Sequence, residues 1–437
     1  MTISRIRRDV LYLVHRVPYP PDKGDRIRAF HLVRFLSGLV NVHLACLADE
    51  PVSREALLAL GRLCARVAIV PHRGLARWLR GLGSLLRGCT VTEGVFSSPA
   101  LRRVLRGWAR ETHFHAALAS ASSMVPYLRV PELKGVPAVV DLVDVDSEKW
   151  LDYAAESRGP AAWLYRVEGR RLRRLERELP RWARAVTLVS EAEAALYRRF
   201  AAPGAVLAVT NGVDLHYFHP MPAADEQGCV FVGALDYRPN VEGAVWFCRE
   251  VWPELRRRDP QARLVLVGRR PVPAVRRLAE LPGVEVAGTV PDVRPFVARA
   301  AVVVVPLRLA RGVQNKVLEA LAMGKSTVVS PQALEGLAAK PGAEVVVAST
   351  PQEWVAAVAA LLADPQRRQA LGAAGRRYVE RHHEWDHCLE PFGRLLGLAP
   401  QVNGTGAQPS LARRAGVGSC SSARQANGGV IVNSERP

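Results

Sequence analysis

The chain has 437 residues, 49% of them hydrophobic, which is enough for two domains of ordinary size and a tail. No apolar run approaches the roughly 20 residues that span a bilayer, and 10–14 is too short for a signal peptide, so we expect neither feature. Seven cysteines without metal-ligand spacing predict reduced thiols in a cytoplasm. The net charge of +19 indicates either an arginine-rich coding bias or an anionic partner such as a membrane surface, and no nucleic-acid-binding motif accompanies it.

The first part of the chain predicts alternating strands and helices. A strand is predicted at 9–15, and the prolines that follow keep the chain extended. Gly24 then permits a tight turn before a helix that begins near Arg26. Further strands are predicted at 41–47, 66–71, 115–119, 136–142 and 185–190. Such strand–helix–strand units imply a parallel sheet. Gly24 would lie at the carboxyl end of a strand, where open sheets bind ligands, although solvated charges at a helix start fit the same pattern.

Two helices of this part carry many arginines. The segment 74–86 is amphipathic, and Arg77, Arg80 and Arg87 flank its apolar face. That face consists of Leu75, Trp78, Leu79, Leu82, Leu85 and Leu86. A core-facing helix with solvated arginines fits the pattern, and so does a helix that contacts a membrane surface. A longer helix predicted at 163–183 has an arginine-rich outer face, where Glu168, Glu176 and Glu178 offset part of the charge.

Three aspartates follow the strand predicted at 136–142. Asp141, Asp144 and Asp146 belong to the run VVDLVDVDSEKW and stand at or beyond the strand's end. Alternating carboxylates can bind a metal ion. Asp146 or Ser147 can instead cap the helix that begins here. The residue pattern by itself leaves these interpretations open.

The second part of the chain repeats the alternation after a turn at Asn211-Gly212, where positive φ permits a change of direction. Strands are predicted at 230–232, 263–268, 284–288, 302–305 and 326–330. A helix predicted at 315–323 follows a Gly-containing loop, and Gly324 ends it. Its first N–H groups have no partners within the helix, so the junction can bind an anion. Glu319, one turn into this apolar helix, could accept hydrogen bonds from a ribose.

The run LEALAMGK at 318–325 resembles the donor-site signature of family 4 retaining glycosyltransferases, which have the GT-B fold. That signature has a second Glu eight positions earlier, where this chain has Arg311, so the role of the earlier Glu does not carry over. The run GVQNKVLE at 312–319 is similar to a subgroup reading G-x-x-N-K-x-L-E. This subgroup includes sugar transferases associated with exopolysaccharide and PEP-CTERM/exosortase loci, and the aspartate run resembles the same subgroup.

The resemblance implies two Rossmann-like parallel-sheet α/β domains that face each other across a cleft. The acceptor-side domain would cover 1–208 and the nucleotide-sugar-binding domain 209–384. A helix at 385–398 would cross back to the first domain, and a disordered tail would cover 399–437. The segment from Asn211 to Pro220 resembles the passage between the two domains in this family.

The resemblance also implies the roles of individual residues. Asp144 or Asp141 would face the reacting sugar in place of the family's catalytic His, Gly24 would approach it, and Glu319 would bind the donor ribose. The residues implied in donor binding are Gly233, Arg238, Asn240, Gly288, Val290, Gly312, Val313, Gln314, Asn315, Lys316 and Glu319. We expect no metal or other cofactor, because helix N-termini with Arg and Lys neutralise a leaving diphosphate.

The function implied is a hexosyltransferase that moves a sugar, with retention, from a nucleotide-diphosphate sugar to a lipid-linked or polysaccharide acceptor. Its setting would be exopolysaccharide or cell-envelope glycan synthesis, in the cytoplasm or peripheral at the inner face of the cell membrane. Two other functions fit the same donor site. One is a GT-B nucleotide-sugar epimerase, and the other is a non-catalytic accessory protein of a polysaccharide-assembly complex.

Overall fold

The computed structural model describes residues 7–22, 24–222 and 228–398, together with the backbone of Val430–Val432. Most of the predicted tail, 399–437, therefore lies outside the described residues. Contacts divide the chain into two compact units. Unit 1 covers Met1–Val140 and Phe392–Pro437, and unit 2 covers Asp141–Pro391. The domain boundaries expected at 208 and 384 remain predictions.

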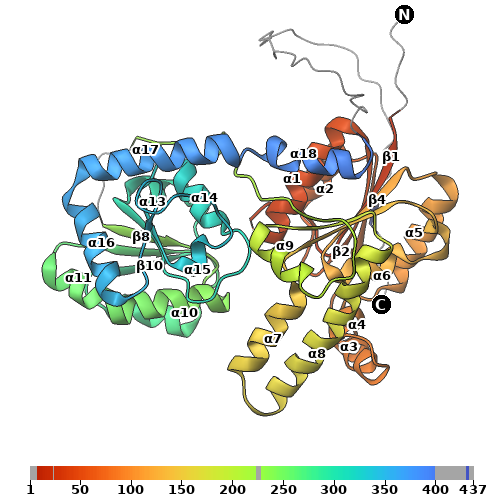
Figure 1. Ribbon diagram of the computed structural model, residues 1–437, viewed down its shortest axis with the longest axis horizontal. Helices are drawn as coiled ribbons and strands as arrows, with labels where there is room; N and C mark the ends of the chain where they lie inside the picture. The colour runs from red at the N-terminus through yellow and green to blue at the C-terminus, as the bar shows by residue number, and fades with distance from the viewer. Residues whose placement is uncertain (1–6, 23, 223–227, 399–429, 433–437) are drawn as a thin grey trace, which may run out of the picture. The chain divides into compact units, whose positions relative to one another are not determined.

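The first sheet begins in unit 1, and its strand order is β14-β3-β2-β1-β4-β5-β6-β7 (Figure 1). β1 lies in the middle and pairs in parallel with β2 and β4. The strands are β1 (Asp9–Val14), β2 (Asn41–Ala48), β3 (Arg66–Pro71), β4 (Ala116–Ser120), β5 (Ala138–Val143), β6 (Ala185–Leu188), β7 (Val206–Ala208) and β14 (Val430–Val432). β1 is apolar along most of its length because both faces of the sheet are covered, and Val10–Leu13 are completely buried.

The second sheet lies within unit 2, and its strand order is β10-β9-β8-β11-β12-β13. Every neighbouring pair in this sheet is parallel. The strands are β8 (Cys229–Val232), β9 (Leu264–Val267), β10 (Val284–Gly288), β11 (Val302–Val305), β12 (Thr327–Val329) and β13 (Val346–Val347). β11, four consecutive valines next to the centre, is buried throughout. The order reverses beside β8, and such reversals are where open α/β sheets bind ligands.

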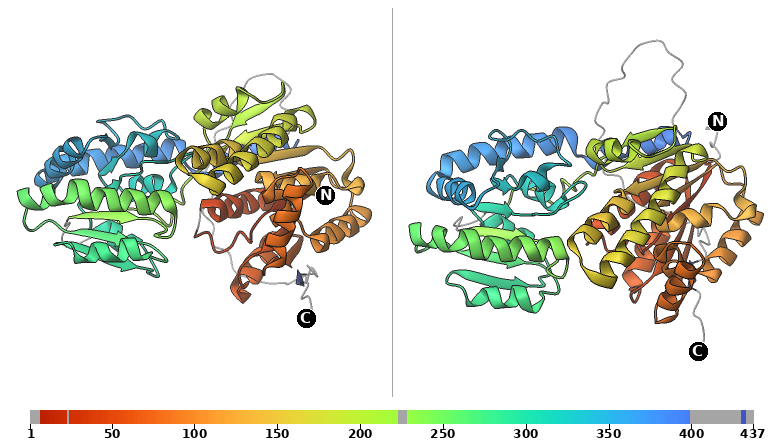
Figure 2. Two further views of the ribbon diagram at one scale, coloured as in Figure 1. Left: turned by 90° about the horizontal axis from the view of Figure 1, so that it is seen from below. Right: turned by 60° about the horizontal axis from the view of Figure 1, so that its bottom comes forward.

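Helices connect the parallel strands and cover both faces of each sheet (Figures 1 and 2). The helices before β5 are α1 (Gly24–Leu39), α2 (Arg54–Leu63), α3 (Ala76–Leu86), α4 (Val91–Val95), α5 (Pro99–Glu111) and α6 (Val125–Leu128). Between β5 and β8 come α7 (Asp146–Glu156), α8 (Gly159–Glu178) and α9 (Glu191–Arg198). The others are α10 (Arg238–Trp246), α11 (Trp252–Arg258), α12 (Pro273–Arg276), α13 (Arg294–Arg299), α14 (Asn315–Ala322), α15 (Pro331–Leu334), α16 (Pro351–Ala363), α17 (Pro365–His382) and α18 (Trp385–Leu395). The predicted fold class, two parallel-sheet α/β domains, is confirmed.

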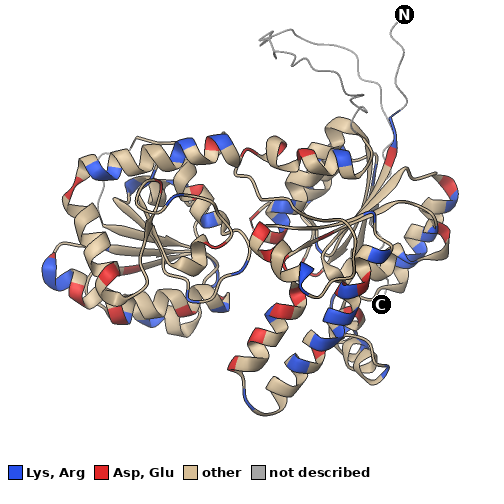
Figure 3. Ribbon diagram, viewed as in Figure 1, with Lys and Arg blue, Asp and Glu red and all other residues tan. Residues whose placement is uncertain are grey.

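Two expectations about charged side chains hold only in part. Arginines recur along α8 (Figure 3), and Glu178 at its end pairs with the exposed Arg181, but Glu168 and Glu176 are buried and do not offset charge on the outer face. At the start of α1, Arg26 and Arg28 are buried and not solvated. Arg26 donates to Glu50 at 2.7 Å, so its charge is neutralised within unit 1. An ionic partner allows a charged group to be buried against an otherwise apolar helix face, and periodicity does not reveal such partners.

Candidate functional site

The start of α14 and the turn after β8 form one polar cluster. The Lys316 Nζ donates a hydrogen bond to Asn240 Oδ1, and the Asn240 Nδ2 donates to the Ala234 carbonyl at 2.9 Å. Gly233 lies against both side chains. A Cβ added there would be 2.8 Å from Asn240 Nδ2 and 3.2 Å from Lys316 Nζ. A side chain at this position, directly after β8, would displace both polar groups of the cluster.

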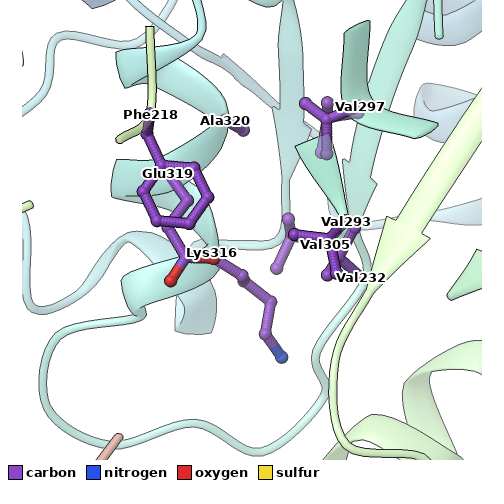
Figure 4. Close-up of a pocket in the computed structure, with 9 residues that line it drawn as sticks. Phe218, Val232, Val293, Val297, Val305, Lys316, Glu319 and Ala320 are labelled. Carbon is purple, nitrogen blue, oxygen red and sulfur yellow. The ribbon is translucent and has the colours of Figure 1, made fainter. Parts of the chain in front are cut away.

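Glu319 lies one turn after Lys316 and lines a narrow pocket with it (Figure 4). The other lining residues are Phe218, Val232, Val293, Val297, Val303, Val305 and Ala320. Burial raises the pKa of Glu319 to about 7, although the charge of Lys316 opposes this shift. Burial also lowers the pKa of Lys316 to about 8, against the attraction of Glu319. A polar ligand would stabilise the charged form of each group, because apolar walls solvate neither charge well.

The loop before α14 brings its backbone close to Asp144. Gly312 has a φ of 63°, and a Cβ added there would lie 2.2 Å from Asp144 Oδ1. α14 has no side-chain N-cap hydrogen bond among the described residues. The Gln314 side chain turns back and donates to the Arg311 carbonyl at 2.9 Å, while Asn315 Oδ1 accepts from Asn211 at 3.0 Å. The Val317 N–H donates to the Gln314 carbonyl at 2.9 Å, so the N–H groups of Asn315 and Lys316 are the ones that could face an anion, and the anion site stays a prediction.

Arg311, which stands where the family signature has Glu, is held by two carboxylates. Its guanidinium donates to Asp152 Oδ2 at 2.6 and 3.0 Å and to Glu193 Oε1 at 3.4 Å. Asp152 belongs to α7 and Glu193 to α9. The arginine therefore ties the loop before α14 to both helices. The roles of Asp152 and Glu193 leave no local sequence pattern, because their partner is more than 100 residues away.

The backbone beside Asp144 is strained. Val143 has a φ of 70°, and the Asp144 N–H donates to the Leu142 carbonyl at 2.9 Å, which defines a tight three-residue turn. A β-branched residue at positive φ is costly, and such strain concentrates at functional sites. The turn directs Asp144 away from β5 towards Gly312. Asp141 is completely buried instead, and its Oδ1 accepts from the Thr187 hydroxyl at 2.7 Å. The geometry thus favours Asp144 of the two predicted candidates.

The predicted capping of α7 by Asp146 or Ser147 was wrong. The N-cap is Val145, and two glutamates from elsewhere accept the N–H groups at this end. Glu193 accepts from the Val145 N–H at 2.7 Å, and Glu176 accepts from the Ser147 N–H at 3.0 Å and also from the Ser147 hydroxyl. Burial raises the pKa of Glu176 to about 8, and the nearby Asp146 adds to the shift. Long-range partners of this kind leave no local sequence pattern.

A second group of polar residues adjoins Asp144. The pKa of Lys149 is raised by electrostatic interaction with Tyr237, Asp146, Tyr153 and Asp144, although burial alone would lower it. Lys149 is not among the predicted site residues. The signal that could have identified it is the lysine in the run DSEKW, one helical turn after the aspartates.

Arg238 lies at the first position of α10 and is already paired. It donates to Glu242 and to Glu156, each at 2.7 Å, and its guanidinium lies 5.6 Å from the centre of the Tyr153 ring. A ligand phosphate would have to compete with these carboxylates for Arg238. Lys316, which donates to the neutral Asn240 amide, is therefore the better placed cation for a phosphate.

The remaining predicted residues have other local environments. Gly288 ends β10 with a φ of 68°, and its carbonyl accepts from the Gly268 N–H at 2.8 Å. Val290 and Val313 are half-buried against the core of unit 2. Gly24 is the exposed first residue of α1 in unit 1. The structure thus brings together Gly233, Asn240, Lys316 and Glu319, and separately Gly312 and Asp144.

Two searches of the described residues gave negative results. Between 7 and 398, apart from the short gaps, no group of three His, Cys, Asp or Glu side chains could hold a metal ion. Within the same part of the chain, no helix combines the length and apolar character needed to cross a membrane.

Known proteins with the same fold include several glycosyltransferases. Sucrose-phosphate synthase from Thermosynechococcus elongatus superposes with a TM-score of 0.66 at 18% identity, covering 89% of this chain and 98% of that one. HepE from Anabaena, in complex with UDP and glucose, gives 0.65 at 13% identity, covering 89% and 99%. TarM from S. aureus, in a complex that contains UDP, gives 0.63 at 8% identity with the same coverage. A search among the sequences of curated proteins found no match.

Sequence comparison gives a narrower result than the structures do. Residues 226–364 match the family described as "Glycosyl transferases group 1". This range begins just before β8 and ends just after α16, so it contains the second sheet and the cluster of Gly233, Asn240, Lys316 and Glu319. Residues 226–364 therefore match a glycosyl transferases group 1 domain, and the chain as a whole has a two-sheet fold like that of GT-B glycosyltransferases.

Proposed function

We propose that this protein is a retaining glycosyltransferase of the hexosyltransferase type, with a nucleotide-diphosphate sugar as its donor. The observation that carries the proposal is the pairing of Lys316 and Glu319 on one side of α14, inside the matched domain. A cation beside free helix N–H groups suits a diphosphate. A carboxylate one turn further along suits the two hydroxyls of a ribose.

The other residues of the site would act on the transferred sugar and on the leaving group. Asp144 would face the sugar from the strained turn after β5, and the backbone at Gly312 would lie close enough to contact it. Lys316 and the N-terminus of α14 would stabilise the negative charge that develops on the diphosphate as the glycosidic bond breaks. In a retaining reaction the acceptor attacks the face of the sugar that the diphosphate leaves. We propose retention on the resemblance of 318–325 to family 4 enzymes.

We also propose that the reaction needs no metal ion, because the charge on the diphosphate can be met by Lys316 and the helix N-terminus. Chelation with EDTA should then leave the rate of sugar transfer unchanged. A rate that is lost on chelation and restored by added Mg²⁺ or Mn²⁺ would contradict this part of the proposal.

The acceptor we propose is a lipid-linked or polysaccharide glycan of exopolysaccharide or cell-envelope synthesis, used at the inner face of the cell membrane. Two sequence runs support this choice, GVQNKVLE at 312–319 and the aspartate run that ends at Trp150, since both resemble PEP-CTERM/exosortase-associated transferases. The Anabaena protein HepE, in complex with UDP-glucose, shares the fold and supports a nucleotide sugar as the donor.

Donor binding is the most direct test. Nucleoside diphosphates and their sugars should raise the melting temperature of the protein, because a ligand that binds only the folded state stabilises it. Glu319→Gln should weaken the binding of the best ligand by about 1.5–3 kcal/mol, the range for a hydrogen bond to a charged group. Glu285→Gln, which alters an exposed carboxylate on β10, is the matched control and should not change binding. Unchanged affinity in folded Glu319→Gln would remove Glu319 from the donor site.

The two candidate cations can be separated by the choice of ligand. Lys316→Met should weaken the binding of a nucleoside diphosphate much more than the binding of the bare nucleoside. Arg238→Ala should show a smaller difference, because Arg238 is paired with Glu242 and Glu156. Equal losses for both ligands would mean that the residue acts through folding. An epimerase would release nucleoside diphosphate and an epimerised sugar without any acceptor, which product analysis detects.

A further inference from the structure

A row of exposed large hydrophobic side chains lies on α3 and the residue before it. We name this surface the α3 face and define it by Leu75, Trp78, Leu79, Leu82 and Leu86. Their exposed fractions are 80%, 55%, 69%, 59% and 85%. These five are almost half of the eleven large hydrophobic side chains that are exposed among the described residues. They recur at helical spacing, so the surface is continuous.

The opposite side of α3 explains why the large side chains point outwards. Gly81 and Ser84 are the buried residues of this helix, and they pack against Gly94 of α4. A Cβ on Gly94 would lie 2.3 Å from Ser84 Oγ and 2.7 Å from the Gly81 Cα. Ser84 also donates to the Thr90 carbonyl at 2.7 Å. The helix is therefore anchored through small residues, and a core-facing role for its leucines, one of the two predicted alternatives, is wrong.

Positive charge surrounds the α3 face. No Asp or Glu occurs between 71 and 92, whereas this segment contains four arginines. Arg73 and Arg87 are exposed, and Arg77 and Arg80 are half-buried. The Arg77 guanidinium lies 5.4 Å from the centre of the Trp78 ring, so a charge sits beside the aromatic anchor. Tryptophan and arginine beside an apolar face are the composition of helices that lie in a membrane interface.

We propose that the α3 face docks unit 1 on the surface of an anionic lipid bilayer. α3 has 11 residues, too few to span a bilayer but enough to bury one face at the boundary between headgroups and acyl chains. Lipid is favoured over a second copy of the chain, because two α3 faces brought together would bring eight arginines together. Docking would deliver a membrane-borne acceptor to unit 1, and this consequence rests on the proposed function, whereas the docking itself does not.

Vesicle co-sedimentation tests the proposal on the full chain. The protein should sediment with vesicles of phosphatidylcholine and phosphatidylglycerol at low salt, and much less with phosphatidylcholine alone. The double variant Leu79→Glu/Leu82→Glu should lower the partition coefficient by more than about tenfold, since two exposed anchors are lost and two like charges are added. Arg73→Glu/Arg87→Glu should also lower the partition coefficient, and this loss should be larger at lower salt. Leu58→Glu, on an exposed leucine of α2 outside this face, is the matched control and should bind normally.

Two additional measurements decide between occupants of the surface. A polarity-sensitive dye on the exposed Cys89, in a Cys420→Ser background, should shift to the blue on anionic vesicles. Binding to nucleoside diphosphate should be unchanged in Leu79→Glu/Leu82→Glu, and vesicle binding should be unchanged in Glu319→Gln, so either proposal can fail alone. Absence of sedimentation on anionic vesicles at low salt overturns the docking proposal. So does a concentration-dependent dimer that disappears in Leu79→Glu/Leu82→Glu.

Discussion

Among single residues, Lys316 and Glu319 combine opposite charges with mostly apolar surroundings. They lie one turn apart on α14, and apolar walls bring their pKa values to about 8 and about 7. Burial disfavours the charged form of both groups, so the pair is costly in the empty protein. Sites of this kind usually trade stability for function. The consequence can be measured as a dependence of stability on pH.

Replacing Glu319 with Gln should stabilise the protein above neutral pH. The folded protein holds the Glu319 proton more tightly than the unfolded chain, so the wild-type stability contributed by this group falls as pH rises from 4.5 to about 7. A shift of this size corresponds to about 3 kcal/mol at most, and to about 1–2 kcal/mol after partial solvation. Urea unfolding at pH 5 and pH 8 should show a gain for the variant at pH 8 only. An equal effect at both values would mean that the carboxylate is not strained by burial.

Gly312 allows a second prediction at the same scale. Gly312→Ala adds a Cβ at positive φ that also collides with Asp144, whereas Gly342→Ala adds one at a φ of 79° with no atom within 4 Å. The control therefore isolates the backbone cost, about 1–3 kcal/mol. We expect Gly312→Ala to lower the free energy of unfolding by more than Gly342→Ala, and to lower the rate of sugar transfer as Asp144 is displaced. Equal losses of stability and normal transfer would show that the contact with Asp144 is dispensable.

At the scale of helices, the start of α7 depends on carboxylates from other elements. Glu176 of α8 and Glu193 of α9 accept its first N–H groups, and Glu193 also pairs with Arg311. One carboxylate thus contacts both the end that carries Asp144 and the loop before α14. These contacts hold the catalytic candidates through side chains that would not themselves touch the substrate.

Removing the Glu176 carboxylate should destabilise the protein. Glu176→Ala leaves the buried Ser147 N–H without an acceptor, which should cost about 1–3 kcal/mol. Glu178→Ala, on the exposed part of the same helix, should cost much less. Because burial raises the pKa of Glu176 to about 8, its contribution to stability falls as pH rises from 4.5 to about 8. Glu176→Gln should therefore be more stable than wild type at pH 9, and denaturant unfolding of the three variants checks this.

Most helices and strands could be predicted from the chain itself, because hydrophobic periodicity reports which residues are buried. β3, β10 and β11 have the predicted bounds. α14 begins at the predicted residue and ends one residue before its predicted end. β7 was not predicted, since three half-buried residues leave little pattern. The buried glutamates of α8 and the capping of α7 could not be predicted either. Their stability comes from partners that are distant in sequence, and a single sequence does not show which distant residues meet.

For the molecule as a whole, the residues around Lys316 were easier to predict than those around Asp144 and on α3. The cluster of Gly233, Asn240, Lys316 and Glu319 follows from short motifs next to strand ends, which parallel sheets bring to one edge. Asp152, Glu193 and Lys149 were missed because they act through tertiary contacts. The outward orientation of α3 was also undecided, since an amphipathic pattern reports a face without saying what covers it.

Thiol reactivity offers a test of the whole fold. Of the six described cysteines, only Cys89 is exposed. Burial raises the pKa of the Cys46, Cys64, Cys229 and Cys248 thiols, so these should react very slowly with a maleimide in the native state. Peptide mapping after a short reaction should find label on Cys89. Label on Cys420, which lies outside the described residues, should be quantified separately. In denaturant all seven should react. Rapid native labelling of Cys46 in β2 would contradict the packing of the first sheet.

The pairing of Lys316 with Glu319 also makes donor binding exchange protons with the buffer. A diphosphate beside Lys316 favours the charged ammonium, so near pH 8 a fraction of the lysines should take up a proton when the ligand binds. Titration calorimetry should then give a less exothermic heat in Tris than in phosphate at that pH, because Tris releases its protons at a larger enthalpic cost. Lys316→Met should remove the difference. Identical heats in both buffers would mean that Lys316 does not change its protonation when the ligand binds.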